Sequence, residues 1–286
     1  MKCLFIVNPG SGAGQKDWEQ IIKDFFAGRS EQIQFYQLEK DADNKEEIKK
    51  MIRSYQPDRV ITAGGDGTIK MTAEALLEFN IPLGIIPAGS ANGMAKELNI
   101  PLNPESALQL SISAQSKPLD LISINNEYCI HLSDIGLNAS MLERFEENER
   151  RGFLGYSEAL MKMMGRHQFM RVTIYANNRI YKRKVVMAVI ANASKYGTGA
   201  IINPAGDPSD GEFEVVLVRR LGLFALLRMI ITRKPLNENR VEIIKCKQMR
   251  LTVTRPYPFQ IDGEYRDKLK EINAVIEPGV IQVISS

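Results

Sequence analysis

Short apolar runs alternate with stretches of helical period over the first 120 residues. Strands are predicted at Leu4 to Val7, Ile33 to Leu38, Arg59 to Ala63 and Leu83 to Ile86. Helices are predicted between them, because apolar residues recur there at i, i+3 and i+4 spacing. These residues are Trp18, Ile21, Ile22, Phe25 and Phe26 in one stretch and Ile48, Met51, Ile52 and Tyr55 in the next. Such alternation indicates a doubly wound α/β domain with a parallel sheet.

From about Leu119 the pattern changes to short apolar runs that are separated by turn residues. The runs are Tyr128 to Leu132, Arg171 to Ala176, Val185 to Ala191, Phe213 to Val218, Met249 to Thr254 and Ala274 to Ile276. This spacing predicts an antiparallel sandwich or barrel. Two helical patterns, Phe153 to Phe169 and Leu221 to Arg233, interrupt it. We therefore expect an α/β domain over 1–120, which 276–286 could complete, and a β-rich domain over 121–275.

Composition narrows the class of protein. Hydrophobic residues make up 44% and charged residues 25% of the 286-residue chain, which is typical of a folded globular protein. The net charge of +3 is spread along the chain, so it does not favour a nucleic-acid partner. Cys3, Cys129 and Cys246 lie far apart without zinc-ligand spacing, which fits a reducing cytoplasm. The apolar stretch from Leu4 to Val7 is too short for a signal peptide or a membrane span.

Glycine-rich turns follow three of the predicted strands. The first turn contains Asn8, Pro9, Gly10, Ser11 and Gly12, the second contains Gly64, Gly65, Asp66, Gly67 and Thr68, and the third contains Ser90 and Asn92 within Pro87 to Gly93. The carboxyl ends of strands are where open α/β sheets bind ligands. Glycine lets backbone N–H groups approach phosphate oxygens closely. Three such turns therefore predict a polyphosphate ligand.

The middle turn gives the most specific signal. The first turn alone is weak, because it lacks the ending of a P-loop and the spacing of a dinucleotide fingerprint. Three glycines around Asp66 exceed what a plain strand-to-helix turn needs, since one N-cap residue is enough there. Next to phosphates, an aspartate can hold Mg²⁺ or accept a proton from an attacking hydroxyl. Both roles are open for Asp66.

These turns carry a family resemblance. Asn-Pro-x-Ser-Gly, Gly-Gly-Asp-Gly-Thr and Pro-x-Gly-Ser-x-Asn, in this order, resemble the diacylglycerol kinase catalytic-domain family, which includes bacterial lipid kinases and sphingosine kinases. The likeness continues to Asp262-Gly263-Glu264, so it spans nearly the whole chain. Gly-Gly-Asp-Gly-Thr also occurs in NAD kinases and, in part, in phosphofructokinases. The resemblance implies an NAD kinase/phosphofructokinase-like nucleotide-binding domain followed by an antiparallel β-sandwich.

The resemblance also implies roles for individual residues. The three turns would line the phosphates of ATP, with Asp66 near the γ-phosphate and its Mg²⁺. Glu264 would accept the proton of a lipid hydroxyl, and Asp262 is the close competitor for that role. A structural Mg²⁺ in the second domain would be held by Asp207, Asp210 and the main-chain carbonyl of Glu212. A solvated acidic turn is the alternative for these last residues.

Some positions depart from the family pattern. Lys70 and Met71 stand where family members usually have Asn and Glu, and Gly93 stands where they usually have Asp. Lys70 is expected to be a surface charge, although it could reach a phosphate. These departures keep open a non-catalytic nucleotide- or lipid-binding regulator. The shared Gly-Gly-Asp-Gly-Thr keeps open an NAD kinase-like enzyme that acts on a soluble substrate.

The lipid would be diacylglycerol, a sphingoid base or a related lipid, by the same resemblance. A Met-rich stretch that includes Leu160, Met161, Met163 and Met164 could line an acyl-chain channel, although core packing is the commoner use. The helix predicted at Leu221 to Ile231 has basic flanks, which suits a membrane surface or docking on the sandwich. We expect a cytoplasmic protein in peripheral contact with the membrane, and a homodimer is left open.

Overall fold

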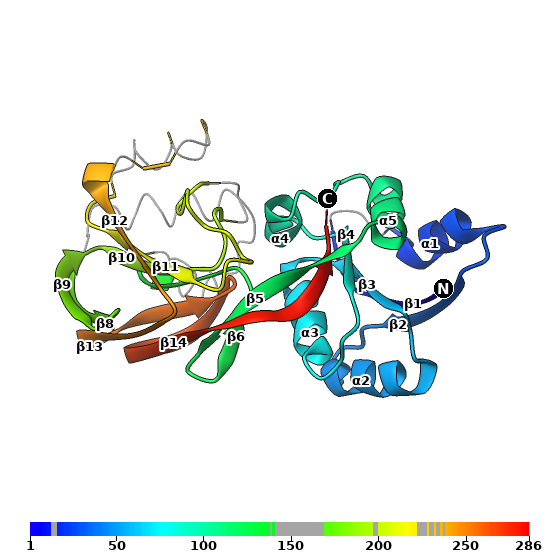
Figure 1. The fold of residues 1–286 in the computed structure, drawn as a ribbon, viewed down its shortest axis with the longest axis horizontal. Coiled ribbons are helices and arrows are strands. Elements are labelled where there is room, and N and C mark those ends of the chain that lie inside the picture. The colour runs from blue at the N-terminus through cyan, green and yellow to red at the C-terminus, as the bar shows by residue number, and fades with distance from the viewer. Residues whose placement is uncertain are drawn as a thin grey trace. The chain divides into compact units, whose positions relative to one another are not determined.

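The structure is a computed structural model that describes residues 1–12, 16–137, 139–140, 169–196, 200–221, 228, 232, 235–236 and 238–285. The chain divides into two compact units (Figure 1). Met1–Leu119 and Gly279–Ser286 form the first unit, and Asp120–Pro278 form the second. The last strand, β14 (Glu264–Ile284), therefore begins in the second unit and ends in the first.

The first unit is a parallel sheet with helices on both faces (Figure 1). Its strands are β1 (Lys2–Val7), β2 (Gln32–Gln37), β3 (Arg59–Gly64) and β4 (Leu83–Pro87), and its helices are α1 (Trp18–Phe26), α2 (Asn44–Tyr55), α3 (Asp66–Leu76), α4 (Gly93–Glu97) and α5 (Pro104–Ser113). The sheet order is β14-β4-β3-β1-β2, with parallel pairing throughout. The doubly wound α/β prediction is confirmed.

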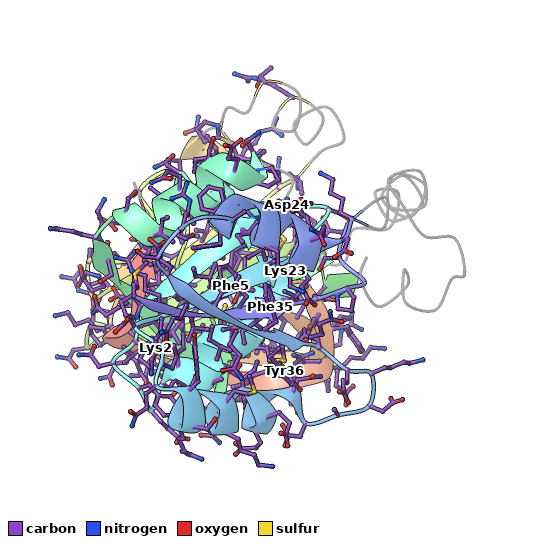
Figure 2. All side chains as sticks on the ribbon, turned by 90° about the vertical axis from the view of Figure 1, so that its right-hand side faces the viewer. Lys2, Phe5, Lys23, Asp24, Phe35 and Tyr36 are labelled. Atoms are coloured by element: carbon purple, nitrogen blue, oxygen red, sulfur yellow. The ribbon has the colours of Figure 1, made fainter. Side chains whose placement is uncertain are left out.

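Burial explains why these segments form strands and helices. Strand β1 is buried at five consecutive residues, as expected for a central parallel strand that is covered on both faces. Helix α1 begins after Asp17, whose side chain accepts a hydrogen bond from Gln20 N. The ring of Phe5 packs against Phe26 of α1 and stacks on Phe35 of β2, both at 5.6 Å between centroids (Figure 2). The expected apolar stripe of α1 thus faces the sheet.

The second unit is built from antiparallel strands. They are β6 (Glu127–Cys129), β7 (Leu132–Gly136), β8 (Met170–Ala176), β9 (Arg179–Val185), β10 (Met187–Ala191), β11 (Phe213–Val218), β12 (Val241–Cys246) and β13 (Gln248–Ile261). The unit also contains β5 (Ser116–Ile124) from Asp120 onward, most of β14 and a short 3₁₀ helix, η1 (Glu238–Arg240). One path runs β12-β11-β10-β7-β13-β14. Strand β13 pairs with β8 near its start and with β7 near its end, with an irregularity in its register against β14 between Thr252 and Tyr257. It thereby takes part in both layers of a β-sandwich.

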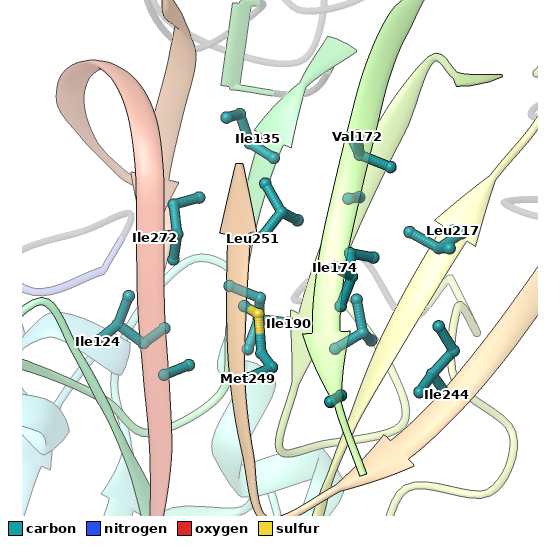
Figure 3. Close-up of a cluster of buried hydrophobic side chains, with 14 of the residues drawn as sticks. Ile124, Ile135, Val172, Ile174, Ile190, Leu217, Ile244, Met249, Leu251 and Ile272 are labelled. Atoms are coloured by element: carbon teal, nitrogen blue, oxygen red, sulfur yellow. The ribbon is translucent and has the colours of Figure 1, made fainter. Parts of the chain in front are cut away.

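The core of this unit is aliphatic and draws on most of its strands. Ile135, Ile174, Leu217, Leu251 and Ile272 lie in one buried cluster (Figure 3). Each comes from a different strand. Alternate residues of β11, such as Val216 and Val218, belong to a second buried cluster, so this strand is covered on both faces. The predicted β-rich second half is confirmed as a sandwich.

Two predictions differ from the structure or lie outside it. The run Tyr128 to Leu132 was predicted as one strand, but a bend at Ile130 and His131 separates β6 from β7. The helix predicted at Phe153 to Phe169 and most of the helix predicted at Leu221 to Arg233 lie outside the described residues. Within the described part of the chain, no helix is long and apolar enough to cross a membrane.

Candidate functional site

The three glycine-rich turns meet at one edge of the parallel sheet in the first unit. Strands β1, β3 and β4 are neighbours in the sheet, so their carboxyl ends lie side by side. Asn8 N donates to Ala63 O at 3.0 Å, which ties the first turn to the end of β3. Ala88 N donates to Gly64 O at 3.0 Å, which ties the third turn to the same strand. The convergence expected from the sequence is therefore present.

Two asparagine side chains shape these turns. Asn8 Nδ2 donates to Thr68 Oγ1 at 3.1 Å, and Asn8 Oδ1 accepts from Gly10 N at 3.0 Å. Asn92 holds the third turn through Gly89, since its Oδ1 accepts from Gly89 N and its Nδ2 donates to Gly89 O, both at 2.8 Å. Asn8, Thr68 and Asn92 thus have internal partners. Their contribution to ligand binding would come through the shape of the turns.

Close backbone contact explains two of the glycines. A Cβ on Gly89 would lie 2.5 Å from Gly65 Cα, so the second and third turns can touch only through glycine. A Cβ on Gly12 would lie 2.8 Å from Ala88 O, and the φ of Gly12 is +90°, which side-chain-bearing residues avoid. Pro9, Gly10, Gly12, Gly67 and Ser90 are exposed at the surface of these turns. They are the predicted phosphate contacts that a ligand could reach directly.

Asp66 has a structural partner that the sequence did not reveal. It is the first residue of α3, and its two carboxylate oxygens accept hydrogen bonds from Gly93 N at 2.9 Å and Met94 N at 3.0 Å. These N–H groups open α4, whose own N-cap residue, Asn92, makes no side-chain cap. Asp66 therefore caps a neighbouring helix and joins the second turn to the third. A carboxylate has about four acceptor sites, so these two bonds leave capacity for a cation.

Asp262 is engaged by the backbone of the second unit. It forms the β13–β14 turn with Gly263, and both have positive φ (52° and 88°), as a type I′ turn requires. Its carboxylate accepts hydrogen bonds from Ile130 N at 3.1 Å, His131 N at 2.9 Å and Leu132 N at 3.3 Å. These bonds hold the bend between β6 and β7, and they account for the break in the predicted strand. Asp262 thus has a structural role that does not require a substrate.

Glu264 is in a different environment. Its side chain is 55% exposed, and Oε2 accepts a 2.6 Å hydrogen bond from Arg266 Nη2. Arg266 also binds both oxygens of Glu127, at 2.6 to 3.0 Å. The hydrogen bonds to Glu127 and then Glu264 raise the pKa of Arg266, so its charge is permanent. Glu264 is therefore an accessible carboxylate that a fixed cation orients.

Comparison with known proteins agrees with this architecture. A family model described as "Diacylglycerol kinase catalytic domain" matches residues 2–124, and one described as "YegS C-terminal NAD kinase beta sandwich-like domain" matches residues 133–285. The chain belongs to the family of proteins that join a diacylglycerol kinase catalytic domain to a YegS-type NAD kinase β-sandwich-like domain. The second model matches its C-terminal half, so the two together span almost the whole chain.

Relatives in sequence support the same assignment, and a solved structure shares the fold. A protein of Staphylococcus carnosus (strain TM300) named "Putative lipid kinase" is 27% identical over 70% of this chain and 68% of its own. One of Staphylococcus aureus (strain JH9), named "Putative lipid kinase SaurJH9_0749", is 26% identical over 84% and 81%. A crystal structure described as a diacylglycerol kinase from Bacillus anthracis str. Sterne shares the fold, with a TM-score of 0.76 at 20% identity over 100% of this chain and 97% of that one. Membership of this family supports a kinase.

The departures from the diacylglycerol kinase pattern have clear positions in the structure. Lys70 is only 7% exposed, so the expected surface charge is wrong. It lies one helical turn after Asp66 on α3, on the same side of the helix. Gly93, which replaces the usual Asp, is buried and donates its N–H to Asp66. Gly93 therefore lies at the junction of the second and third turns, and Lys70 lies one helical turn from this junction along α3.

The residues predicted to hold a structural Mg²⁺ already have partners of their own. Asp207 Oδ1 accepts from Ser209 N at 3.1 Å and Ser209 Oγ at 2.7 Å, which closes a local turn. Asp210 Oδ1 accepts from Glu212 N, and Asp210 Oδ2 lies 2.7 Å from Lys245 Nζ. In the described ranges, no group of three or more His, Cys, Asp or Glu side chains is arranged to hold a metal. The Lys245 ammonium thus lies at the Asp210 oxygen that remains for the predicted divalent ion.

Two residues that contact the predicted site residues, Arg266 and Lys245, were not predicted from the sequence. Arg266 follows Glu264 by two positions on one strand, and the period of two that puts both on one face was the available signal. Lys245 lies opposite Glu214 across the β11–β12 pair, and a register of that kind cannot be read from a single sequence. The Met-rich stretch proposed for an acyl channel lies outside the described residues, so its role stays a prediction.

Proposed function

We propose that the protein is an ATP-dependent kinase that phosphorylates a hydroxyl group of a lipid, such as diacylglycerol or a sphingoid base. The observation that carries the proposal is the meeting of three glycine-rich turns at the carboxyl ends of β1, β3 and β4. Family membership supports the kinase chemistry, and the names of the relatives support the lipid. Exposed backbone at Gly10, Gly12 and Gly67 suits a triphosphate.

In the proposed reaction, the lipid hydroxyl oxygen attacks the γ-phosphorus of ATP. The bond to the bridging oxygen breaks, ADP leaves, and the hydroxyl proton passes to the Glu264 carboxylate. We favour Glu264 over Asp262 because Asp262 already accepts three backbone hydrogen bonds, whereas Glu264 is exposed. Arg266 would hold the Glu264 carboxylate in one direction. Transfer then depends mainly on the positioning of the reactants.

Magnesium would accompany the nucleotide in this proposal. Asp66 is the candidate ligand in the first unit, because its carboxylate lies between the second and third turns and keeps spare acceptor sites. When bound, Mg²⁺ would neutralise charge on the phosphates. The role of the protein is to hold Asp66 rigidly, and the two hydrogen bonds from Gly93 and Met94 do this.

A panel of acceptors tests the substrate class. Purified protein with γ-labelled ATP and Mg²⁺ should transfer label to one or more of diacylglycerol, monoacylglycerol, sphingoid bases or ceramide, presented in detergent micelles. Thin-layer chromatography of the products, with NAD as a soluble acceptor in a parallel reaction, provides the measurement. Formation of NADP without any lipid product would favour the NAD kinase-like alternative. Tight lipid binding without ATP binding in calorimetry would favour the non-catalytic regulator.

We also propose that the second unit makes peripheral contact with anionic membranes. The outward face of β8 and β9 carries Arg171 directly opposite Lys184, with Lys182 nearby. Beside them Ile180, 62% exposed, stands opposite Tyr175, 45% exposed. Such a mixture of basic and apolar side chains suits the interface of an anionic bilayer. In this proposal, the face and the helix predicted at 221–231 would both contact the membrane.

Charge reversal on this face should weaken membrane binding. The double variant Lys182→Glu, Lys184→Glu should co-sediment with phosphatidylglycerol vesicles at least about 30-fold less well than wild type, since each of the two basic residues contributes about 1 kcal/mol near such a surface and about 1.4 kcal/mol is a factor of ten. Activity on lipid in detergent micelles should stay unchanged. The variant Lys40→Glu, Lys247→Glu changes the net charge equally and should bind like wild type. Equal losses in the two variants would argue against a specific surface.

A further inference from the structure

An ammonium group lies among three carboxylates at the edge of the second unit. Lys245 of β12 is paired across the ladder with Glu214 of β11. Its Nζ lies 2.7 Å from Asp210 Oδ2, 3.4 Å from Glu212 Oε2 and 4.0 Å from Glu214 Oε1. An ammonium has three donors, so one lysine can serve this whole set. Lys245 is therefore the centre of the cluster.

Glu214 shows why a cation is needed at this place. The residue is 2% exposed, and its Oε2 accepts from Asn203 Nδ2 at 2.7 Å. Among the described residues, its Oε1 is buried without a hydrogen-bond partner, and Lys245 Nζ lies 4.0 Å from it. A carboxylate that is buried away from water is costly while it is charged. A nearby positive charge reduces that cost.

The adjoining loop is held by its own groups. Asp207 closes a turn onto Ser209, and Asp210 Oδ1 accepts from Glu212 N. Gly211 N donates to the buried Asp120 at 2.7 Å, which ties the loop to β5. The remaining Asp210 oxygen is the one that binds Lys245. The loop thus receives its counter-charge from the same chain.

We infer that Lys245 supplies the positive charge that a structural Mg²⁺ supplies in proteins of the kind that this sequence resembles. The second unit then folds and holds loop 207–212 without a divalent cation. Any Mg²⁺ requirement of the protein would come from the nucleotide alone. This inference concerns the architecture of the second unit, so it stands or falls separately from the proposed kinase function.

Thermal unfolding and hydrogen exchange of the whole protein, without nucleotide, test the inference. Wild type should show the same Tm and the same exchange in peptides covering 204–214 in EDTA and in millimolar Mg²⁺. In EDTA, Lys245→Met should exchange faster in these peptides and have a lower Tm than wild type. Mg²⁺ should partly reverse the faster exchange and the fall in Tm. Lys247→Met, which removes an exposed lysine two residues further on, is the matched control and should behave like wild type.

Three outcomes would overturn the inference. The first is a wild-type protein whose Tm falls, or whose 204–214 exchange rises, when EDTA removes Mg²⁺; this arm needs no variant and holds even if Lys245→Met does not fold. The second is a Lys245→Met protein that matches Lys247→Met in both measurements. The third is a destabilised Lys245→Met protein that responds to none of Mg²⁺, Mn²⁺ and Ca²⁺, because the lysine would then not stand where a divalent ion can bind.

Discussion

Replacing Glu264 with glutamine should lower kcat for lipid phosphorylation by roughly 10²- to 10⁴-fold, the usual contribution of a proton acceptor. Glutamine keeps the size of the side chain and can still accept a hydrogen bond from Arg266, but it cannot take the proton of the lipid hydroxyl. The side chain is 55% exposed, so its loss of charge should change Tm little. The KM for ATP should also stay close to that of wild type.

A second glutamate on the same strand provides the control for this variant. Glu271 lies on β14, is exposed, and accepts a 2.8 Å hydrogen bond from Arg250, so it reproduces the setting of Glu264 without the proposed role. Glu271→Gln should retain full activity. Steady-state kinetics of both variants on the same micellar lipid makes the comparison. If Glu264→Gln keeps wild-type kcat, the proton acceptor lies elsewhere and Asp262 becomes the next candidate.

Much of the fold could be predicted because burial and local sequence agree. In the first unit, continuous apolar runs such as Leu4 to Val7 lie in fully covered strands, and the stripe from Trp18 to Phe26 packs on the sheet. In the second unit, the turn residues Asn177 and Asn178 both adopt positive φ, at 53° and 57°, between β8 and β9. Periodicity and turn preference point to the same structure at these places.

What could not be predicted depends on contacts between distant residues. The bend at Ile130 and His131 exists because Asp262, more than 100 residues later, takes their N–H groups. Lysine is usually a surface residue, yet tertiary packing buries Lys70 on α3. The same reason applies to Lys245, whose partners follow from the register of β11 and β12. A local pattern contains none of this information.

In the candidate site, too, some features could be predicted from the sequence and others could not. The meeting of the three turns followed from a general property of parallel sheets, in which neighbouring strands end at one edge. The hydrogen bonds of Asp66 could not be predicted in this way, because α4 is capped by a residue of another turn and not by its own preceding residue. Asp66 could therefore be important for structure, for catalysis or for both, and a single substitution measured by activity alone would not separate these roles.

Asp66→Asn should lower kcat by at least about 10²-fold, because an amide is a poor ligand for the nucleotide-bound Mg²⁺ and lacks the charge that opposes it. The same change should also cost about 1 kcal/mol of stability. One amide oxygen can replace only one of the two acceptors that now bind Gly93 N and Met94 N, and the loss of a helix cap is usually of this size. Kinetics at saturating ATP and denaturant unfolding of the same preparation measure both effects.

A second cap in the same unit isolates the structural part of this effect. Asn103 caps α5 by accepting a hydrogen bond from Ser106 N, in a position with no proposed contact to substrate. Asn103→Ala should lower the free energy of unfolding by a similar amount, about 1 kcal/mol, and leave kcat unchanged. If the two variants lose stability equally and both keep their activity, Asp66 acts only as the cap of α4. A large loss of kcat in Asp66→Asn alone, at matched stability, would then have to come from the chemistry at the three turns.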